Sequence, residues 1–263
     1  MNAVSLTPVD LAVAASLVAF DAALSVLLRL RLHRQVLFAA ARMVVQLIAV
    51  GYILRFVFAL RNPAATLGLV VLMAVIAARE IAARPERRLR GSAGLALSAG
   101  GVVIATAATV ILALATAIRP HPWYDARYAV TLAGIILGSV LNAGSLALDS
   151  FLSGVGRERP AIEAQLALGA GFSQAVASLL REAVRRGLLP IINQMSAAGV
   201  ITLPGIMTGQ ILAGLDPLEA VKYQILLMFL LAGASGLSAL VITYGAMRRM
   251  TDDRQRLRLD RLT

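Results

Sequence analysis

Long apolar runs dominate this sequence, and short polar or basic turns separate them. An α-helix of about 20 apolar residues is long enough to cross the hydrocarbon core of a bilayer. The pattern predicts seven such helices, and hence an all-α, polytopic membrane protein in which residues 1–263 form a single transmembrane domain. The predicted spans lie near residues 9–29, 36–59, 64–83, 94–118, 128–149, 188–213 and 219–246.

The sixth run differs from the others because helix breakers and amides interrupt it. Pro204 and Gly205 stand inside the apolar segment of residues 187–217, which a simple anchor would fill with leucine, valine and isoleucine. A polar group in hydrocarbon costs free energy unless it has a partner. We therefore expect this segment to belong to a transport path. Its polar residues are Asn193, Gln194, Thr202, Thr208 and Gln210.

Residues 150–187 form the longest connection between spans, and their pattern is helical. Apolar residues recur there every three or four positions, while charged and amide residues fill the other face, which predicts an amphipathic helix. Such a helix either lies on the membrane surface or forms a docking surface for a cytoplasmic partner. The apolar face consists of Ile162, Leu166, Gly169, Phe172, Val176, Leu179 and Val184.

Composition supports the membrane assignment. Hydrophobic residues make up 59% of the chain and charged residues 15%, with a mean hydropathy of +0.80, whereas soluble proteins average about 25% charged residues. The net charge of +11 does not indicate nucleic-acid binding, because the basic residues form short clusters between apolar runs. The absence of cysteine excludes disulfides and thiolate sites. The first ten residues lack the basic region of a cleavable signal peptide, so we expect the first run to be retained.

The basic clusters predict the orientation of the chain in the membrane. Most of the 25 Lys and Arg residues lie in the turns after the first and third spans, in residues 150–187 and in the carboxyl-terminal tail. The turns on the other side hold only Arg61, Arg119, Arg127 and Lys222. By the positive-inside rule, the amino terminus is outside, and residues 150–187 and the carboxyl terminus are cytoplasmic.

Two charged residues lie at membrane depth near the amino terminus. At 1.5 Å per residue, Asp21 of the first span and Arg42 of the second are about 12 and 9 Å from the inner surface. Burying an arginine at such depth costs about 2.5–3.5 kcal/mol, so Arg42 is expected to face protein or water. Gln46 shares its helical face. We predict an Asp21–Arg42 ion pair, the alternative being that each side chain finds water or backbone carbonyls separately.

Glycines four residues apart occur in two spans, as Gly134 with Gly138 and Gly205 with Gly209. Small residues at this spacing let two helices approach closely, within the chain or between two copies of it.

The tests for enzyme chemistry are negative. Ser235 lies in a GASG motif like that of intramembrane serine proteases, but neither histidine, His33 or His121, follows it in the chain. No GxxxxGK[ST] phosphate-binding loop occurs, so any ATP hydrolysis must take place on another subunit.

Within residues 188–231, the run LPGIMTGQILAG resembles the LPGMMTGQILAG signature of the FetB-type permease family, with Ile206 as the one departure. The stretch AARMVVQLIAVGYIL also resembles that family's arginine–glutamine segment, with Arg42, Gln46 and Gly51. Members of the family are membrane subunits of ABC transporters linked to iron export in bacteria, and plant relatives are tied to aluminium tolerance. The resemblance extends over the whole chain.

The resemblance implies a transport subunit of the bacterial inner membrane that is not itself an enzyme and binds no cofactor. Its expected partners are a cytoplasmic ABC ATPase, which carries ATP and Mg²⁺, and a second copy of the permease. Glu163 and Ala164, followed by Gly169, resemble the start of the EAA-type loop by which such permeases dock on the ATPase. Pro190 lies farther from Gly169 than the usual proline of that loop.

The resemblance also implies alternating access with iron or another metal species as cargo. A sugar nucleotide or an anionic metal chelate is the alternative cargo, and a secondary transporter or a non-transporting sensor or scaffold is the alternative function. Pro204 and Gly205 fall about 24 Å from the cytoplasmic end of the sixth span, which suggests an external gate or hinge. The residues expected to line the pathway or its gate are Asp21, Arg42, Gln46, Asn193, Pro204, Gly205, Met207, Thr208, Gly209 and Gln210.

Overall fold

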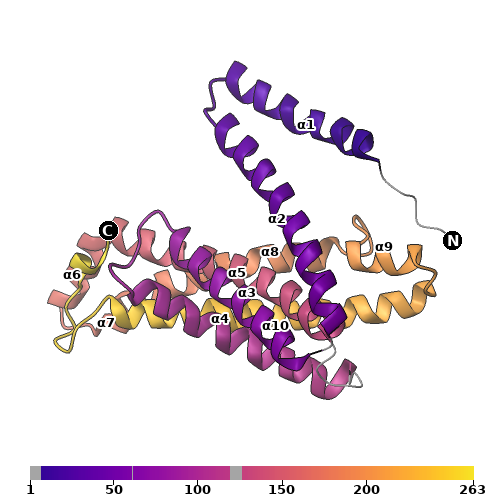
Figure 1. Ribbon diagram of the computed structural model, residues 1–263. Coiled ribbons are helices and arrows are strands. Elements are labelled where there is room, and N and C mark those ends of the chain that lie inside the picture. The colour runs from indigo at the N-terminus through magenta and orange to yellow at the C-terminus, as the bar shows by residue number, and fades with distance from the viewer. Residues whose placement is uncertain (1–6, 61, 119–125) are drawn as a thin grey trace. The chain divides into compact units, whose positions relative to one another are not determined.

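The computed structural model describes residues 7–60, 62–118 and 126–263, and in these residues the chain is helical apart from turns and isolated β-bridges (Figure 1). The all-α prediction is therefore confirmed. The helices are α1 (Pro8–Leu27), α2 (His33–Leu60), α3 (Pro63–Ala83), α4 (Ala93–Leu112, continued by the π-helix Ala113–Ile118), α5 (Ala126–Arg157), α6 (Arg159–Ala167), α7 (Phe172–Ala175), α8 (Ala177–Ala197), α9 (Gly205–Leu212) and α10 (Pro217–Arg249).

Six of these helices are long and apolar enough to cross a membrane, namely α1, α2, α3, α4 with its π-helical end, α5 and α10. They correspond to six of the seven predicted spans. The predicted span at 188–213 is instead divided between α8 and α9, with a turn at residues 198–204. Gly199 adopts a φ of +83°, and Pro204 has no backbone N–H to donate, so the helix cannot continue through this segment.

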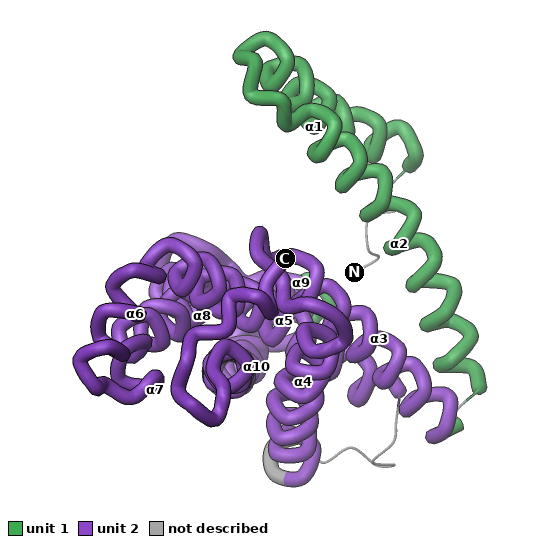
Figure 2. Tube along the Cα trace, turned by 90° about the vertical axis from the view of Figure 1, so that its left-hand side faces the viewer, with its two compact units in different colours: residues 1–62, 212–214 green, residues 63–211, 215–263 purple. Residues whose placement is uncertain are grey.

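The chain forms two compact units (Figure 2). Unit 1 comprises Met1–Asn62 with Leu212–Gly214, and within it α1 and α2 pack against each other as a hairpin. Thr7 and Asp10 cap the start of α1 reciprocally. The buried Ser25 hydroxyl accepts a hydrogen bond of 2.9 Å from the Leu32 backbone N–H, which closes the turn between the two helices.

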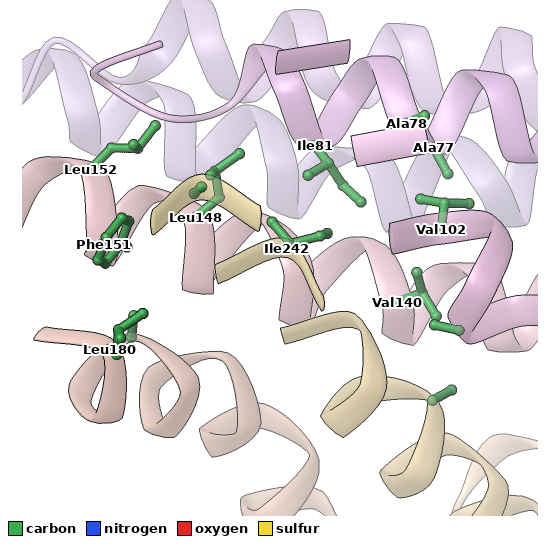
Figure 3. Packing of buried hydrophobic residues seen from close by; sticks show 14 of the residues in the cluster. Ala77, Ala78, Ile81, Val102, Val140, Leu148, Phe151, Leu152, Leu180 and Ile242 are labelled. Carbon is green, nitrogen blue, oxygen red and sulfur yellow. The ribbon is translucent and has the colours of Figure 1, made fainter. Parts of the chain in front are cut away.

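Unit 2 contains the other helices, with α5 packed against α3, α4, α8 and α10. Figure 3 shows part of its core, including Ile81 of α3, Val140 of α5 and Ile242 of α10. The Ser238 hydroxyl donates a hydrogen bond of 3.0 Å to the Val140 carbonyl, which joins α10 to α5 inside this core.

Small residues set the closest approaches between these helices. A Cβ on Gly187 of α8 would lie 2.8 Å from the Ala143 carbonyl oxygen and 3.1 Å from the Ala239 Cβ. A Cβ on Gly144 would meet Ile242 and Ser238 of α10. Of the two glycines singled out by their four-residue spacing in α5, Gly134 approaches α3, since a Cβ there would lie 3.1 Å from the Met73 Cε, whereas a Cβ on Gly138 would have no neighbour within 4 Å.

The helices α5 and α10 contain 32 and 33 residues, so each is about 48–50 Å long, whereas the hydrocarbon core of a bilayer is about 30 Å thick. Their excess length carries α6, α7 and the carboxyl-terminal residues at one end of unit 2. We call residues 251–263 the C-terminal strap. It is tied to the turn after α3, since the Arg90 N–H donates to the Arg261 carbonyl at 2.8 Å and the Thr263 N–H donates to the Arg88 carbonyl at 2.8 Å.

Candidate functional site

The predicted docking residues lie on α6 and on the turn that follows it, at the end of unit 2 that carries the strap. Glu163 and Ala164 are exposed on α6, and the chain reverses after that helix at Gly169, which has a φ of +90°. The Gly169 N–H donates to the Leu166 carbonyl and the Ala170 N–H to the Gln165 carbonyl, both at 3.0 Å. This left-handed helix end favours glycine, although nothing lies within 4 Å of the place a Cβ would occupy.

We call residues 158–176 the coupling segment, and one side of it is anchored in the core. The side chains of Ile162, Phe172 and Val176 are at most 2% exposed and belong to the buried cluster of unit 2. On the other side, Leu168 at the end of α6 is 88% exposed. The segment is therefore a fixed platform with an apolar side chain projecting from it.

The C-terminal strap braces this platform. The side-chain carbonyl of Gln255 accepts a hydrogen bond of 2.9 Å from the Phe172 backbone N–H. A groove of about 350 Å³ separates strap and coupling segment, with Glu163 on one wall and Arg254 and Arg256 on the other. Glu163 also bonds Arg159, one turn earlier on α6, at 2.8 Å. The lining of this groove combines one carboxylate, that of Glu163, with the guanidinium groups of Arg254 and Arg256.

Two carboxylates hold the strap in shape. Asp252 accepts hydrogen bonds from the Arg256 and Arg254 backbone N–H groups, and the first of these bonds is the main reason that its pKa is lowered. Asp260 binds the Arg258 guanidinium through two hydrogen bonds of 2.8 Å, and this contact lowers the pKa of Asp260 to about 2. Both carboxylates are therefore ionised at neutral pH and fix the arginine-rich tail.

The predicted pathway residues of the sixth run lie at the opposite end of unit 2 from the coupling segment (Figure 1). Asn193 is exposed near the end of α8, and α9 contains no buried residue. In α9, the Thr208 hydroxyl donates to the Pro204 carbonyl at 3.2 Å, and Met207 is partly buried. The side-chain oxygen of Gln210 is buried without a hydrogen-bond partner among the described residues.

The four-residue spacing of Gly205 and Gly209 in α9 does not mark a helix contact within the described residues, and a contact between two copies of the chain stays a prediction. Gly205 and Gly209 are exposed, and nothing lies within 4 Å of a Cβ at either position. They make no close helix contact within the described residues. Their small size leaves room beside α9 instead.

Asp21, Arg42 and Gln46 belong to unit 1, where all three are exposed. The Asp21–Arg42 ion pair stays a prediction. Asp21 lies on α1 and Arg42 on α2, and the Ser25 hydrogen bond closes the turn between these two helices.

Sequence reasoning missed Gln224 on α10. This residue is 7% exposed, and its side-chain oxygen has no hydrogen-bond partner among the described residues. The same holds for the hydroxyl groups of the buried Ser98 and Thr106 on α4. The criterion applied to the sixth run, an amide inside an apolar segment, would have identified Gln224 as well.

Among the described residues no group of three or more His, Asp or Glu side chains is placed to hold a metal ion. The polar side chains of α9 are a hydroxyl and an amide, which bind hard cations more weakly than carboxylates do. The nearest carboxylates in the chain are those of Asp216, which caps α10, and Glu219, which is paired with Lys222 at 2.6 Å.

Comparison with known proteins places these features in a family. The model of the uncharacterised protein family UPF0014 matches residues 8–251. The UPF0014 membrane protein slr1647 of Synechocystis is 42% identical over 87% of each chain. The probable iron export permease protein FetB of Escherichia coli is 31% identical over 98% of this chain and 97% of its own. The protein ALUMINUM SENSITIVE 3 of Arabidopsis thaliana is 29% identical over 82% of this chain and 77% of its own. No solved structure matches the chain.

Proposed function

The chain belongs to the UPF0014 family of multi-pass membrane proteins, and from this premise we propose that it is the membrane-spanning subunit of an ABC exporter. In this proposal a separate cytoplasmic subunit hydrolyses ATP, and two copies of the present chain assemble with it. The chain itself supplies the pathway and the docking surface.

The observation that carries the proposal is the coupling segment. Leu168 projects into solvent from a platform whose other side is anchored by Ile162 and Phe172. An isolated exposed leucine is common on proteins, but this one ends a helix whose other side is buried, so little freedom is lost when it inserts into an apolar pocket on a partner. The positive-inside rule assigns this end of unit 2 to the cytoplasm, where an ATPase would bind.

The helix α8 supplies the mechanical link from docking to transport. It begins directly after the coupling segment and has 21 residues, which makes it about 31 Å long, roughly the thickness of the hydrocarbon core. Figure 1 shows α8 running from the end that carries α7 to the end that carries α9. A displacement of the coupling segment by the ATPase would therefore be transmitted by one helix to the predicted gate.

Pro190 divides α8 into a longer part before it and a shorter part after it. It lies inside α8 and has no backbone N–H to donate, so one backbone hydrogen bond between the last turns and the rest of the helix is missing. Gly187 just before it is clamped between α5 and α10. In the proposed mechanism the part before Gly187 moves with the coupling segment, and the part after Pro190 moves with α9.

Iron or another metal species is the proposed cargo. The support is the similarity to the probable iron export permease protein of Escherichia coli, together with the oxygen donors of Asn193, Thr208 and Gln210 at the α9 end. Because these donors are neutral, a metal carried as an anionic chelate fits the same site, as does a sugar nucleotide.

The test is ATP turnover by the permease reconstituted with the ATPase subunit that co-purifies with it. Iron species, other metal ions and nucleotide sugars are then compared for stimulation of turnover. Leu168→Gln is expected to weaken ATPase binding by about tenfold or more, because burying a leucine side chain contributes about 1.5–3 kcal/mol. Leu215→Gln, an exposed leucine between α9 and α10, is the matched control.

Two glycines provide a second matched pair. Gly169→Ala forces a side chain into a left-handed conformation at about 1–2 kcal/mol, whereas Gly171 has a φ of −68° and tolerates alanine. We expect coupled ATP turnover to fall in Gly169→Ala and in Glu163→Gln but not in Gly171→Ala. Wild-type ATPase affinity and turnover in the Leu168, Gly169 and Glu163 variants would exclude the docking role. Transport driven by an ion gradient with no ATPase present would exclude the ABC mechanism altogether.

A further inference from the structure

A second groove lies on the side of unit 2, between α8 and α10. It has a volume of about 610 Å³, and along most of its length the walls are apolar, with Leu188 and Ile192 on α8 facing Leu240 and Met247 on α10. Ile192, Leu240 and the neighbouring Tyr244 are each more than 40% exposed, so the groove opens to the outside of the unit.

The groove carries positive charge at one end only. Arg181 and Arg185 line it there, four residues apart and hence on one face of α8. The single acidic residue of α8, Glu182, is bound to Arg186 at 2.8 Å on another face. Among the described residues neither Arg181 nor Arg185 has an ion-pair partner, so both guanidinium groups are available to an anion at the mouth of the groove.

The length of the groove fits one leaflet of a bilayer. From Arg181 to Ile192 there are 11 residue steps, or about 16 Å along the helix axis, and half of the hydrocarbon core is about 15 Å. The basic end is the end that the positive-inside rule assigns to the cytoplasm. The arginines then stand at the level of the lipid headgroups of the inner leaflet, and the apolar walls extend to about the middle of the membrane.

We propose that this groove binds an anionic phospholipid of the cytoplasmic leaflet. The phosphate lies between Arg181 and Arg185, and one acyl chain lies between α8 and α10 along Leu188 and Ile192. Basic pockets between membrane helices on the cytoplasmic side are suited to anionic headgroups, because the surrounding hydrocarbon strengthens the attraction. Apolar contact alone would not select a lipid, since every acyl chain offers it; the arginine pair makes the site selective for charge.

Such a site would place a lipid against α8 from the end of the coupling segment to just past Pro190. It is independent of the cargo and of the ATPase, and its test requires neither.

The test measures which lipid occupies the groove. Trp123 is the only tryptophan in the chain, so a Trp123→Phe/Tyr244→Trp protein carries one fluorescent reporter in the groove wall. The full-length protein is reconstituted in phosphatidylcholine vesicles containing increasing fractions of phosphatidylglycerol or phosphatidylcholine with brominated acyl chains. Bromine quenches tryptophan on contact, so the dependence on lipid fraction gives the relative affinity for each headgroup.

We expect phosphatidylglycerol to be preferred by about 25-fold, because each arginine near the membrane surface contributes about a fivefold preference. Arg181→Gln/Arg185→Gln should abolish this preference while leaving quenching by both lipids detectable. Arg186→Gln, which removes a charge from the same helix outside the groove, should keep it. Both groove arginines are on the accessible side of α8, so their replacement should not disturb folding.

Three results would overturn the proposal. Equal quenching by the two lipids would show that the groove does not select charge. A preference that persists in Arg181→Gln/Arg185→Gln would place the anionic lipid elsewhere. Quenching by neither lipid, with normal quenching of a tryptophan at the exposed Phe229 of α10, would show that another protein surface, such as a second copy of the chain, covers the groove.

Discussion

Replacing Gly187 with alanine tests whether the contact of α8 with α5 and α10 is as close as the structure shows. The added methyl group would lie 2.8 Å from the Ala143 carbonyl oxygen, 3.0 Å from the Ala147 Cβ and 3.1 Å from the Ala239 Cβ. The nearest obstacle is backbone rather than a flexible side chain. All three alanines are at most 2% exposed, so they have no free space to move into.

Two opposing effects determine how much Gly187→Ala changes the free energy of unfolding. Alanine favours a helix over glycine by about 0.5–1 kcal/mol. Overpacking of a tight core costs about 1–3 kcal/mol. Gly233→Ala on α10 isolates the first effect, because nothing lies within 4 Å of a Cβ there. The free energy of unfolding of Gly187→Ala should therefore be about 1–3 kcal/mol lower than that of Gly233→Ala.

The assay is thermal unfolding of the two purified variants in the same detergent. For a chain of this size, about 2–4 °C per kcal/mol predicts a midpoint for Gly187→Ala roughly 2–12 °C below that of Gly233→Ala. A Gly187→Ala protein at least as stable as Gly233→Ala would refute the close approach of the three helices. The role assigned to Gly187 as a clamp on α8 would then fail as well.

Three further predictions concern the strap, the α9 glycines and the buried amide. Arg258 lowers the pKa of Asp260 from 3.8 to about 2. The stabilisation of the strap by the Asp260–Arg258 ion pair is therefore fully present above pH 3.8 and is lost as the pH falls towards 2. A nitroxide on Asp253→Cys, the only cysteine in such a protein, should gain mobility in that pH range and not between pH 7 and 4; constant mobility down to pH 2 would contradict the ion pair. Gly209→Leu should unfold at the wild-type temperature but transport less cargo, and wild-type flux would remove α9 from the gate. Gln224→Leu should be as stable as wild type or up to about 1–3 kcal/mol more stable, because it removes a buried oxygen without a partner; a clear loss of stability would show that the amide is satisfied.

Local features of the chain were predictable from the sequence. Six apolar runs became six helices whose ends lie within a few residues of the predicted ones, except that α5 extends eight residues past the predicted end at 149 to Arg157. The interruption at Pro204 was also visible, because a missing N–H acts on its own turn regardless of what surrounds it. The amphipathic pattern of residues 150–187 predicted the buried positions of Ile162, Phe172 and Val176 correctly.

Contacts between distant residues were not predictable in the same way. The Asp21–Arg42 pair was inferred from depth alone, and depth does not fix the direction in which a side chain points around its helix, so the pair stays a prediction. The strap contact between Gln255 and Phe172 joins residues 83 positions apart, and no local pattern marks it. The groove between α8 and α10 likewise exists only because these two helices lie side by side.

The difference between local features and long-range contacts has a physical basis. A backbone that faces lipid can form hydrogen bonds only within its own segment, because hydrocarbon offers no partners. The length and composition of each apolar run are therefore enough to predict a membrane helix. Which helices meet depends on the shape of their surfaces, as at Gly187, where a missing side chain on α8 matters only because Ala143 and Ala239 stand opposite. The sequence determined the class of the protein and the amphipathic pattern of residues 150–187. The tertiary structure alone decided which polar groups are buried without partners, which arginines are left for an anion, and how the strap holds the platform.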